Sequence, residues 1–307
     1  MICRRHLSRL IQHHNHHHHA QKSCDTTIHL RRWISRKNTS NTYYDSQSGQ
    51  HVPIHNENEV SVYLRGIGDC STQQVIEMTK QYGCSGSILT LEQEMNDMPS
   101  ISSNDNIYLH IKPELYLNNH QLGERKGSYN LCYEYEVGND DDMMSTIKHM
   151  ATDIQQDVSI GIFDSNIIMD EDPISVAANI ANIIDCTSVS DENETAPYIS
   201  NILIAPPTTT STDNNTTTTI ECCPDNLVHL CEELSYLDVP GPTIKSRLIV
   251  STLNNNEEII EECLQIGINK YILDISDDNM NDDLDDRLRG LKKVVEEEGK
   301  ELILSDV

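Results

Sequence analysis

The chain has few basic residues and almost no large aromatic residues apart from tyrosine. Its 307 residues include one Trp and one Phe, so Ile, Leu, Val and Tyr must supply the core of any fold. Lys and Arg number 22 against 49 Asp and Glu, which gives a formal net charge of −27. Nucleic acid phosphates and anionic membrane surfaces repel such a chain, so we expect neither as a partner. The acidity is compatible with a basic protein partner, and equally with a well-solvated surface.

Metal-binding and redox signatures are also missing. The ten cysteines form no CxxC pair, so their spacing indicates neither a zinc site nor a thioredoxin-like motif. The carboxylates between Asp277 and Asp286 lack the glycine and the spacing of an EF-hand loop, and we expect no metal site. Cys263 falls on the apolar face of an expected helix and should pack in the core. Only Cys222 and Cys223, which follow a polar tract, keep a redox role open.

The first 37 residues differ in charge from the rest. They contain eight basic residues and one acidic residue, Asp25, ahead of a strongly acidic body. This composition fits an organelle transit peptide, which would direct the protein to a mitochondrion or plastid, but a disordered basic tail or a misassigned start fits as well. Residues 1–56 have no apolar periodicity, so we expect them to be disordered and a single domain to span residues 57–307. No apolar run reaches the roughly 20 residues of a membrane-spanning helix.

Short apolar segments alternate with amphipathic segments through the remaining chain, and glycines end several of them. The strands that we expect span residues 60–64, 87–90, 106–111, 131–137, 158–163, 199–207, 247–253, 270–275 and 301–305. The helices that we expect span residues 71–82, 141–154, 173–184, 254–266 and 284–298. The polar stretches 187–197 and 208–219 should form exposed loops. This alternation predicts an α/β fold, a (β/α)8 TIM-type barrel of parallel strands.

Signals for chemistry at the strand ends are weak. Gly66 and Gly68 lack the third glycine and the Lys-Ser or Lys-Thr pair of a phosphate-binding loop, so a turn at the start of the barrel is the simpler interpretation. Lys112 ends a strand, but no Tyr and Asp are placed to work with it. TIM barrels carry their catalytic groups at the carboxyl ends of the strands, and here these ends read Ala-Pro-Pro, Ser-Thr-Leu and Ser-Asp-Val. We therefore expect no catalytic residue, no cofactor-binding residue and no cofactor.

Several segments of the carboxyl-terminal half share their order and spacing with a known family. They are residues 158–166, 200–207, 230–234, 249–253, 268–272 and 304–306. In these segments the chain resembles the regulatory (modifier) subunit of glutamate–cysteine ligase, an aldo-keto-reductase-like barrel that lost its catalysis. The resemblance implies a cytoplasmic, non-catalytic regulator of glutathione biosynthesis that binds the catalytic subunit of the ligase as a heterodimer. Family members continue past the last strand seen here, so either an amino-terminal strand closes the barrel or the barrel is incomplete at its carboxyl end.

Two other functions remain open, a divergent NADPH-dependent aldo-keto reductase and an acidic scaffold or assembly protein in an organelle. The reductase would need a Tyr acid, an Asp and a Lys that tune it, and a His that orients the carbonyl. In the expected register the Lys position falls on Asp164 or Ser165, and the His position falls on Ala205 or Pro206. Arg247 is the only basic residue near the expected site for the adenosine phosphate of NADPH. These positions favour a barrel without enzyme activity.

Overall fold

The computed structural model of the chain separates into two units, residues 1–54 and residues 55–307. It describes residues 42–45, 50–53, 58–67, 70–91, 106–111, 129–138, 143–147, 158–187, 199–206, 210–213, 216–219, 223–239, 243–253, 256–276 and 282–305. In the first unit, β1 (Thr42–Asp45) pairs antiparallel with β2 (Gln50–Pro53). This hairpin lies in the stretch that we expected to be disordered. Residues 1–41, which include the basic segment, fall outside the described residues, so the transit-peptide interpretation stays a prediction.

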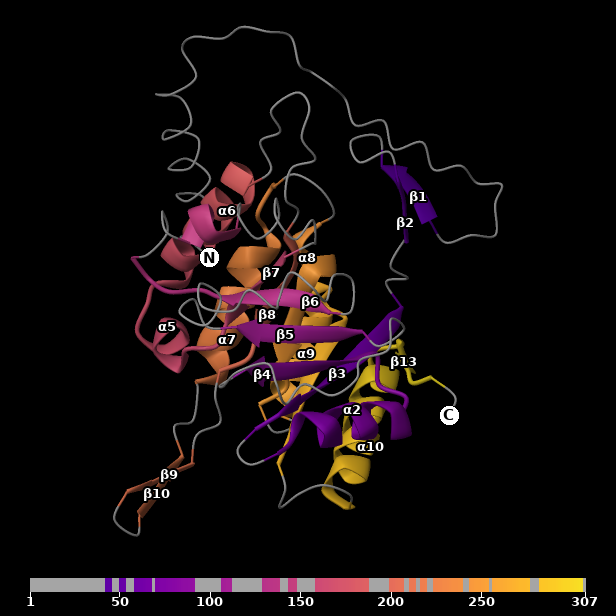
Figure 1. Cartoon of the computed structure of the whole chain (residues 1–307). Coiled ribbons are helices and arrows are strands. Elements are labelled where there is room, and N and C mark those ends of the chain that lie inside the picture. The colour runs from indigo at the N-terminus through magenta and orange to yellow at the C-terminus, as the bar shows by residue number, and fades with distance from the viewer. Residues whose placement is uncertain are drawn as a thin grey trace, which may run out of the picture. The chain divides into compact units, whose positions relative to one another are not determined.

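Eight parallel strands of the second unit close into a barrel, which confirms the predicted (β/α)8 fold (Figure 1). In order around the barrel they are β3 (Glu59–Gly66), β4 (Gly86–Leu91), β5 (Ile107–Ile111), β6 (Asn130–Glu134), β7 (Val158–Ile162), β8 (Ile199–Ile204), β11 (Leu248–Ser251) and β12 (Lys270–Ile275). Each strand pairs in parallel with the next, and β12 pairs back onto β3 from Lys270↔Ser61 to Ile275↔Gly66. All but one of the strands expected from the sequence therefore belong to the closed ring.

The last strand, β13 (Glu301–Ile303), lies outside this ring. It pairs in parallel with the first residues of β3, from Glu301↔Glu59 to Ile303↔Ser61. The Ser305 amide then donates to the Gly83 carbonyl at 2.7 Å. The pairing of β12 with the amino-terminal strand β3 closes the barrel.

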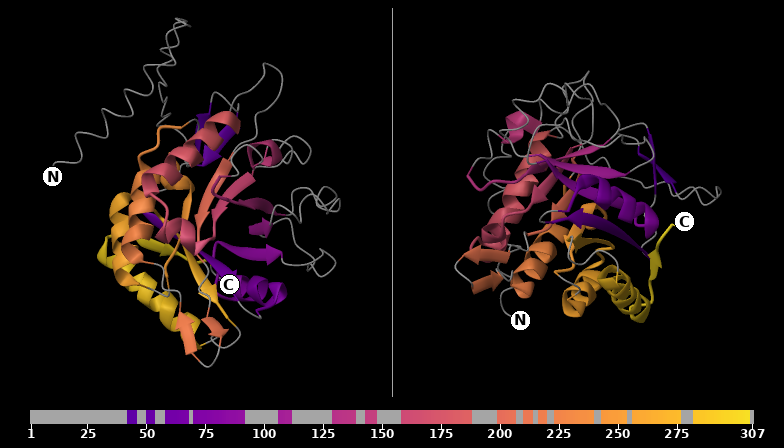
Figure 2. Two further views of the ribbon diagram at one scale, coloured as in Figure 1. Left: turned by 90° about the vertical axis from the view of Figure 1, so that its left-hand side faces the viewer. Right: turned by 60° about the horizontal axis from the view of Figure 1, so that its bottom comes forward.

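Helices cover the outside of the barrel wherever the structure describes them (Figure 2). They are α2 (Thr72–Gln81), α5 (Ser165–Met169), α6 (Pro173–Thr187), α7 (Pro224–Ser235), α8 (Ile244–Arg247), α9 (Glu257–Ile266) and α10 (Asp282–Glu297). A further helical stretch, 143–147, lies within the helix expected at 141–154. Caps explain two of the boundaries: the Asn256 side chain accepts from the first turn of α9, and Gly267 ends that helix with a φ of 98°. Among the described residues no helix is long and apolar enough to cross a bilayer.

The Thr-rich stretch 208–219 is not simply a loop. It contains β9 (Thr210–Asp213) and β10 (Thr216–Thr219), which pair antiparallel with each other and stand apart from the barrel sheet. Threonine is branched at Cβ and favours extended backbone, which accounts for strands in a polar tract. The sequence predicted an exposed loop here and missed these two strands.

The interior of the barrel holds an apolar cluster. It comprises Tyr63, Ile88, Tyr108, Cys132, Phe163, Leu203, Ala205, Ile249 and Ile272. At the amino ends of the strands, Lys270 Nζ donates to Asn201 Oδ1 at 3.2 Å, and Asn201 Nδ2 donates to the Tyr108 hydroxyl at 3.0 Å. At the carboxyl ends the interior becomes charged again. These carboxyl ends form the barrel mouth, where TIM barrels bind their ligands.

Candidate functional site at the barrel mouth

A buried ion pair ties the first strand of the barrel to the last at the mouth. Arg65 of β3 and Asp274 of β12 are register partners, and Nε and Nη2 of Arg65 donate to the two carboxylate oxygens at 2.6 and 2.7 Å. Nη2 also donates to the Pro206 carbonyl at 3.0 Å, and Nη1 donates to the Ala205 carbonyl. The Asp274 carbonyl in turn accepts from Arg287. The charge of Arg65 is thus neutralised inside the protein and is not available to an anionic ligand.

A histidine and a glutamate meet on the neighbouring strands. His110, near the end of β5, places Nε2 3.1 Å from Oε2 of Glu134, the last residue of β6. The side chain of His110 is 8% exposed and that of Glu134 is 19% exposed. Phe163 packs against the imidazole, with the ring centroids 4.1 Å apart. A carboxylate that fixes an imidazole in this way is an arrangement that can move a proton.

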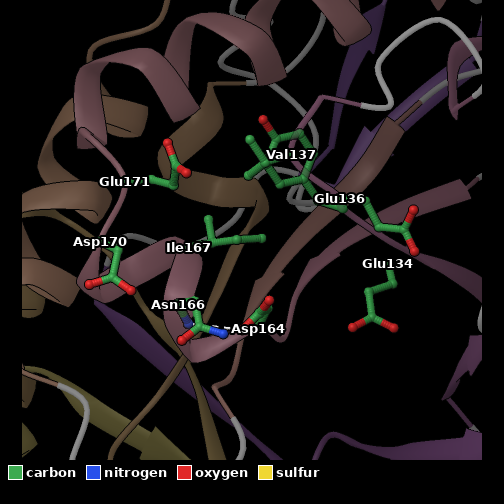
Figure 3. Close-up of a pocket in the computed structure, with 9 residues that line it drawn as sticks. Glu134, Glu136, Val137, Asp164, Asn166, Ile167, Asp170 and Glu171 are labelled. Atoms are coloured by element: carbon green, nitrogen blue, oxygen red, sulfur yellow. Dashed lines mark hydrogen bonds between the residues drawn. The ribbon is translucent and has the colours of Figure 1, made fainter.

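An open hollow of about 510 Å³ adjoins this pair, between the ends of β6 and β7 and helix α5 (Figure 3). Its lining comprises Glu134, Tyr135, Glu136, Val137, Asp164, Asn166, Ile167, Asp170 and Glu171. We call this site the acidic hollow, because five of these nine residues are carboxylates and none is basic. The Asp164 carboxylate caps α5 by accepting from the Asn166 amide at 2.8 Å, so the turn after β7 is held in place locally.

The acidic side chains do not form a metal centre in the described part of the chain. No three His, Cys, Asp or Glu side chains of the described residues converge closely enough to hold a metal ion. The lining carboxylates come instead from the end of β6 and the segment after it, and from the two ends of α5, around an open space (Figure 3). The hollow therefore suits an extended or diffuse positive charge better than a compact cation.

The positions expected for the catalytic residues of a reductase lie in different parts of the barrel. Asp164 lines the acidic hollow, while Ala205 lies in the apolar barrel core and offers only its carbonyl, to Arg65. Lys112 lies outside the described residues. Arg247 was wrongly assigned to the neighbourhood of a cofactor phosphate: it precedes the first residue of β11, at the end of the barrel opposite the mouth.

The structure explains Gly66 and places Cys223, two positions that the sequence analysis singled out. A Cβ atom on Gly66 would lie 2.6 Å from Cγ2 of Val75, so this glycine lets α2 pack closely on β3. Cys223 is half-buried at the amino end of α7, where its amide donates to Sδ of Met169 at 3.1 Å. Cys222 is outside the described residues, so the redox role of the two cysteines stays a prediction.

The sequence analysis did not identify the charged side chains at the barrel mouth, which are Arg65, His110, Glu134 and Asp274. Each lies two residues after an inward-facing core residue on its own strand, namely Tyr63, Tyr108, Cys132 and Ile272. Because side chains alternate along a strand, this offset of two was a usable signal for inward-facing charge at the carboxyl ends. The pairing of Arg65 with Asp274, 209 residues apart, required the closed barrel.

Comparisons with known proteins leave the family open. No protein-family model matches the chain, and no curated protein matches it. Among solved structures it is similar to phospho-2-dehydro-3-deoxyheptonate aldolase from Thermotoga maritima, with 9% identity, a TM-score of 0.43, and coverage of 80% of this chain and 72% of the other. It is also similar to the BexX/CysO complex of Amycolatopsis orientalis, with 12% identity, a TM-score of 0.41, and coverage of 80% of this chain and 94% of the other. For fructose-bisphosphate aldolase from Campylobacter jejuni, the identity is 12%, the TM-score is 0.38, and the match covers 78% of this chain and 88% of the other. Such values carry no inference about activity, and the barrel assignment rests on the strand pairing of the chain itself.

Proposed function

We propose that this barrel is a non-catalytic regulatory subunit, and that its acidic hollow binds a basic segment of a partner protein. The observation that carries the proposal is the hollow itself, which lies at the ligand-binding end of the barrel and is lined by five carboxylates. A lysine or arginine side chain entering it would meet negative charge on several sides. The formal net charge of −27 adds long-range attraction for a basic partner and speeds its association.

The ion pair at the mouth supports binding of cations over binding of phosphates. Enzymes that use NADPH or phosphorylated substrates present arginine or lysine side chains to the ligand. Arg65 is instead saturated by Asp274 and by two backbone carbonyls. Releasing it to a ligand would leave a buried carboxylate without its partner, which costs several kcal/mol.

The resemblance of residues 158–307 to the modifier family makes the catalytic subunit of glutamate–cysteine ligase the first partner to test. Regulation would follow if the barrel binds the active conformation of the catalytic subunit more tightly than the inactive one. The acidic hollow would then be one of the contacts that make this difference. In this proposal the protein acts in glutathione biosynthesis without catalysing a step itself.

The test is a binding titration with the catalytic subunit from the same source. The variant Asp170→Asn with Glu171→Gln removes two exposed carboxylates of the hollow. Exposed ion pairs contribute roughly 0.2–1 kcal/mol each, so Kd should rise about two- to thirtyfold at low salt. The effect should shrink as salt is added, because salt screens exposed charges.

The matched control is Glu262→Gln with Glu298→Gln, which removes the same formal charge from exposed positions outside the hollow. If both doubles weaken binding equally, the attraction is a property of the whole acidic surface and the hollow has no special role. If wild-type protein and catalytic subunit elute separately in gel filtration, and the glutamate dependence of the ligase is unchanged, the regulatory assignment is wrong. An organellar scaffold then becomes the better interpretation.

A second candidate, an acid–base enzyme, is favoured by one observation, the 3.1 Å contact between His110 and Glu134 beside the hollow. Such an enzyme would exchange the α-protons of a carbonyl substrate. The test follows deuterium incorporation from D2O into a panel of small keto acids and amino ketones by NMR. Exchange catalysed by wild-type protein and lost in His110→Asn would favour the enzyme, whereas no exchange above the solvent rate would leave the regulatory proposal ahead.

A further inference from the structure

The acidic hollow has an apolar part as well as its carboxylates. Three of its nine lining residues, Tyr135, Val137 and Ile167, have largely apolar side chains. Tyr135 and Ile167 are buried, and the Tyr135 hydroxyl accepts from Asn179 Nδ2 at 3.2 Å, so its polar end is already bound to α6. Val137, by contrast, is 47% exposed. A ligand that enters the hollow therefore meets exposed apolar surface beside the negative charge.

Exposed large apolar side chains are few in the part of the chain that the structure describes. They are Val137, Met169 and Tyr236. Met169 Sδ accepts from the Cys223 amide at 3.1 Å. The Tyr236 hydroxyl donates to the Glu232 carboxylate at 3.4 Å. These two side chains therefore have polar partners at the two ends of α7, whereas Val137 is the one of the three that lines the hollow.

Carboxylates lie on both sides of this apolar surface. Figure 3 shows the side chains of Val137 and Ile167 near the middle of the hollow, with Glu136 on one side of them and Asp170 and Glu171 on the other. The volume of about 510 Å³ falls within the range of about 300–1,000 Å³ that is typical of pockets for drug-sized ligands. The hollow is therefore large enough for one apolar side chain together with parts of its charged neighbours.

We propose that the acidic hollow recognises a segment of the partner protein in which one large apolar side chain, such as leucine, stands between lysine or arginine residues. The apolar side chain would cover Val137, and the basic residues on its two sides would face the flanking carboxylates. This inference rests on the proposed function and narrows the chemistry of the partner. Salt screens the exposed charges but not the burial of apolar surface, so the two contributions can be measured separately.

The experiment titrates the full-length protein with two short synthetic peptides and measures Kd by calorimetry. Both peptides carry two lysines on each side of a central residue, which is leucine in one peptide and alanine in the other. The leucine peptide should bind about three- to tenfold more tightly, because leucine buries more apolar surface than alanine. Both Kd values should rise with sodium chloride, whereas their ratio should stay the same.

Variants locate the apolar contact. Val137→Ser should raise the Kd of the leucine peptide about three- to tenfold and leave that of the alanine peptide nearly unchanged. The matched control is Tyr236→Ser, which removes an exposed apolar side chain outside the hollow and should change neither Kd. Both substitutions are at exposed positions, so both variants should fold like the wild type.

The outcomes separate this inference from the proposed function. Equal binding of the two peptides would overturn the inference, since the lysine stems alone would then cover Val137, but it would leave binding of basic segments intact. A preference for leucine that survives in Val137→Ser would place the apolar contact elsewhere and overturn the inference as well. If neither peptide binds even at low salt, the hollow does not hold basic segments, and the proposed function fails together with the inference.

Discussion

Burial of the charged Lys270 amine inside the barrel lowers the stability of the folded protein. Its amine lies inside the barrel near the amino ends of the strands, where it donates to the neutral Asn201 Oδ1 at 3.2 Å. Burial lowers the pKa of Lys270 from 10.5 to about 8. Since one pKa unit corresponds to 1.36 kcal/mol, charged Lys270 costs the folded state about 3 kcal/mol at pH 7. Replacing it with Met removes this cost and also loses a hydrogen bond of about 1 kcal/mol. We predict that Lys270→Met stabilises the protein by about 2 kcal/mol at pH 7.

The pH dependence of this difference is the sharper test. Because the pKa of Lys270 is lower in the folded state, the unfolded chain binds more protons between pH 8 and pH 10.5. The wild type should therefore gain stability relative to Lys270→Met across this window, and its full deficit should be present below pH 8. Above pH 10.5 the remaining hydrogen bond should make the wild type the more stable protein.

The assay is urea denaturation of both proteins from pH 7 to pH 10.5. Other groups also titrate in this range: burial raises the pKa of Tyr63 and Cys84 to about 12, so their unfolded forms lose protons first and stability falls. These contributions occur in both proteins and cancel in the difference when the sites are independent. If the difference in unfolding free energy between wild type and Lys270→Met stays constant from pH 7 to pH 10.5, the pKa of Lys270 is not lowered in the folded state.

Three further predictions concern the mouth, the amino terminus and the absence of reductase chemistry. Arg65→Met should lower the free energy of unfolding in urea by about 3–5 kcal/mol, because Asp274 loses its buried partner. The double variant Arg65→Met with Asp274→Leu should recover a large part of this free energy. Equal losses of stability in the single and the double variant would contradict the ion-pair account. A chain beginning at Asn56 should keep the thermal midpoint of the full-length protein, and a fall of several degrees would show that the removed segment packs on the barrel. Wild-type protein with NADPH and a panel of aldehydes should show no turnover above ~1 s⁻¹, an ordinary enzyme rate; faster turnover would establish a reductase.

Periodicity made most of the barrel predictable. Strands such as β7 and β12 are short apolar runs, and helices such as α9 combine an apolar stripe with an Asn cap and a terminal glycine. These are local properties, so they can be recognised without knowing the fold. The hairpin β9–β10 was missed because polarity was taken as evidence for a loop, although Thr favours extended backbone.

The site was much less predictable than the fold, because it depends on strand direction and closure. Arg247 immediately precedes β11, whereas Arg65 lies near the carboxyl end of β3, which puts them at opposite ends of the barrel. The contact of His110 with Glu134 needs the register of β5 with β6. The acidic hollow combines the end of β6 and the residues after it with residues around α5, about 30 positions apart in the sequence.

The central claim is that a partner binds at the acidic hollow, and hydrogen exchange of the complex tests it most directly. The full-length protein would be followed with and without the catalytic subunit of glutamate–cysteine ligase, peptide by peptide. The account predicts slower amide exchange in peptides that cover residues 134–137 and 164–171, which contain the residues that line the hollow. Binding that leaves both peptides unchanged and protects only the amino ends of the strands, near Asn201 and Lys270, would contradict it.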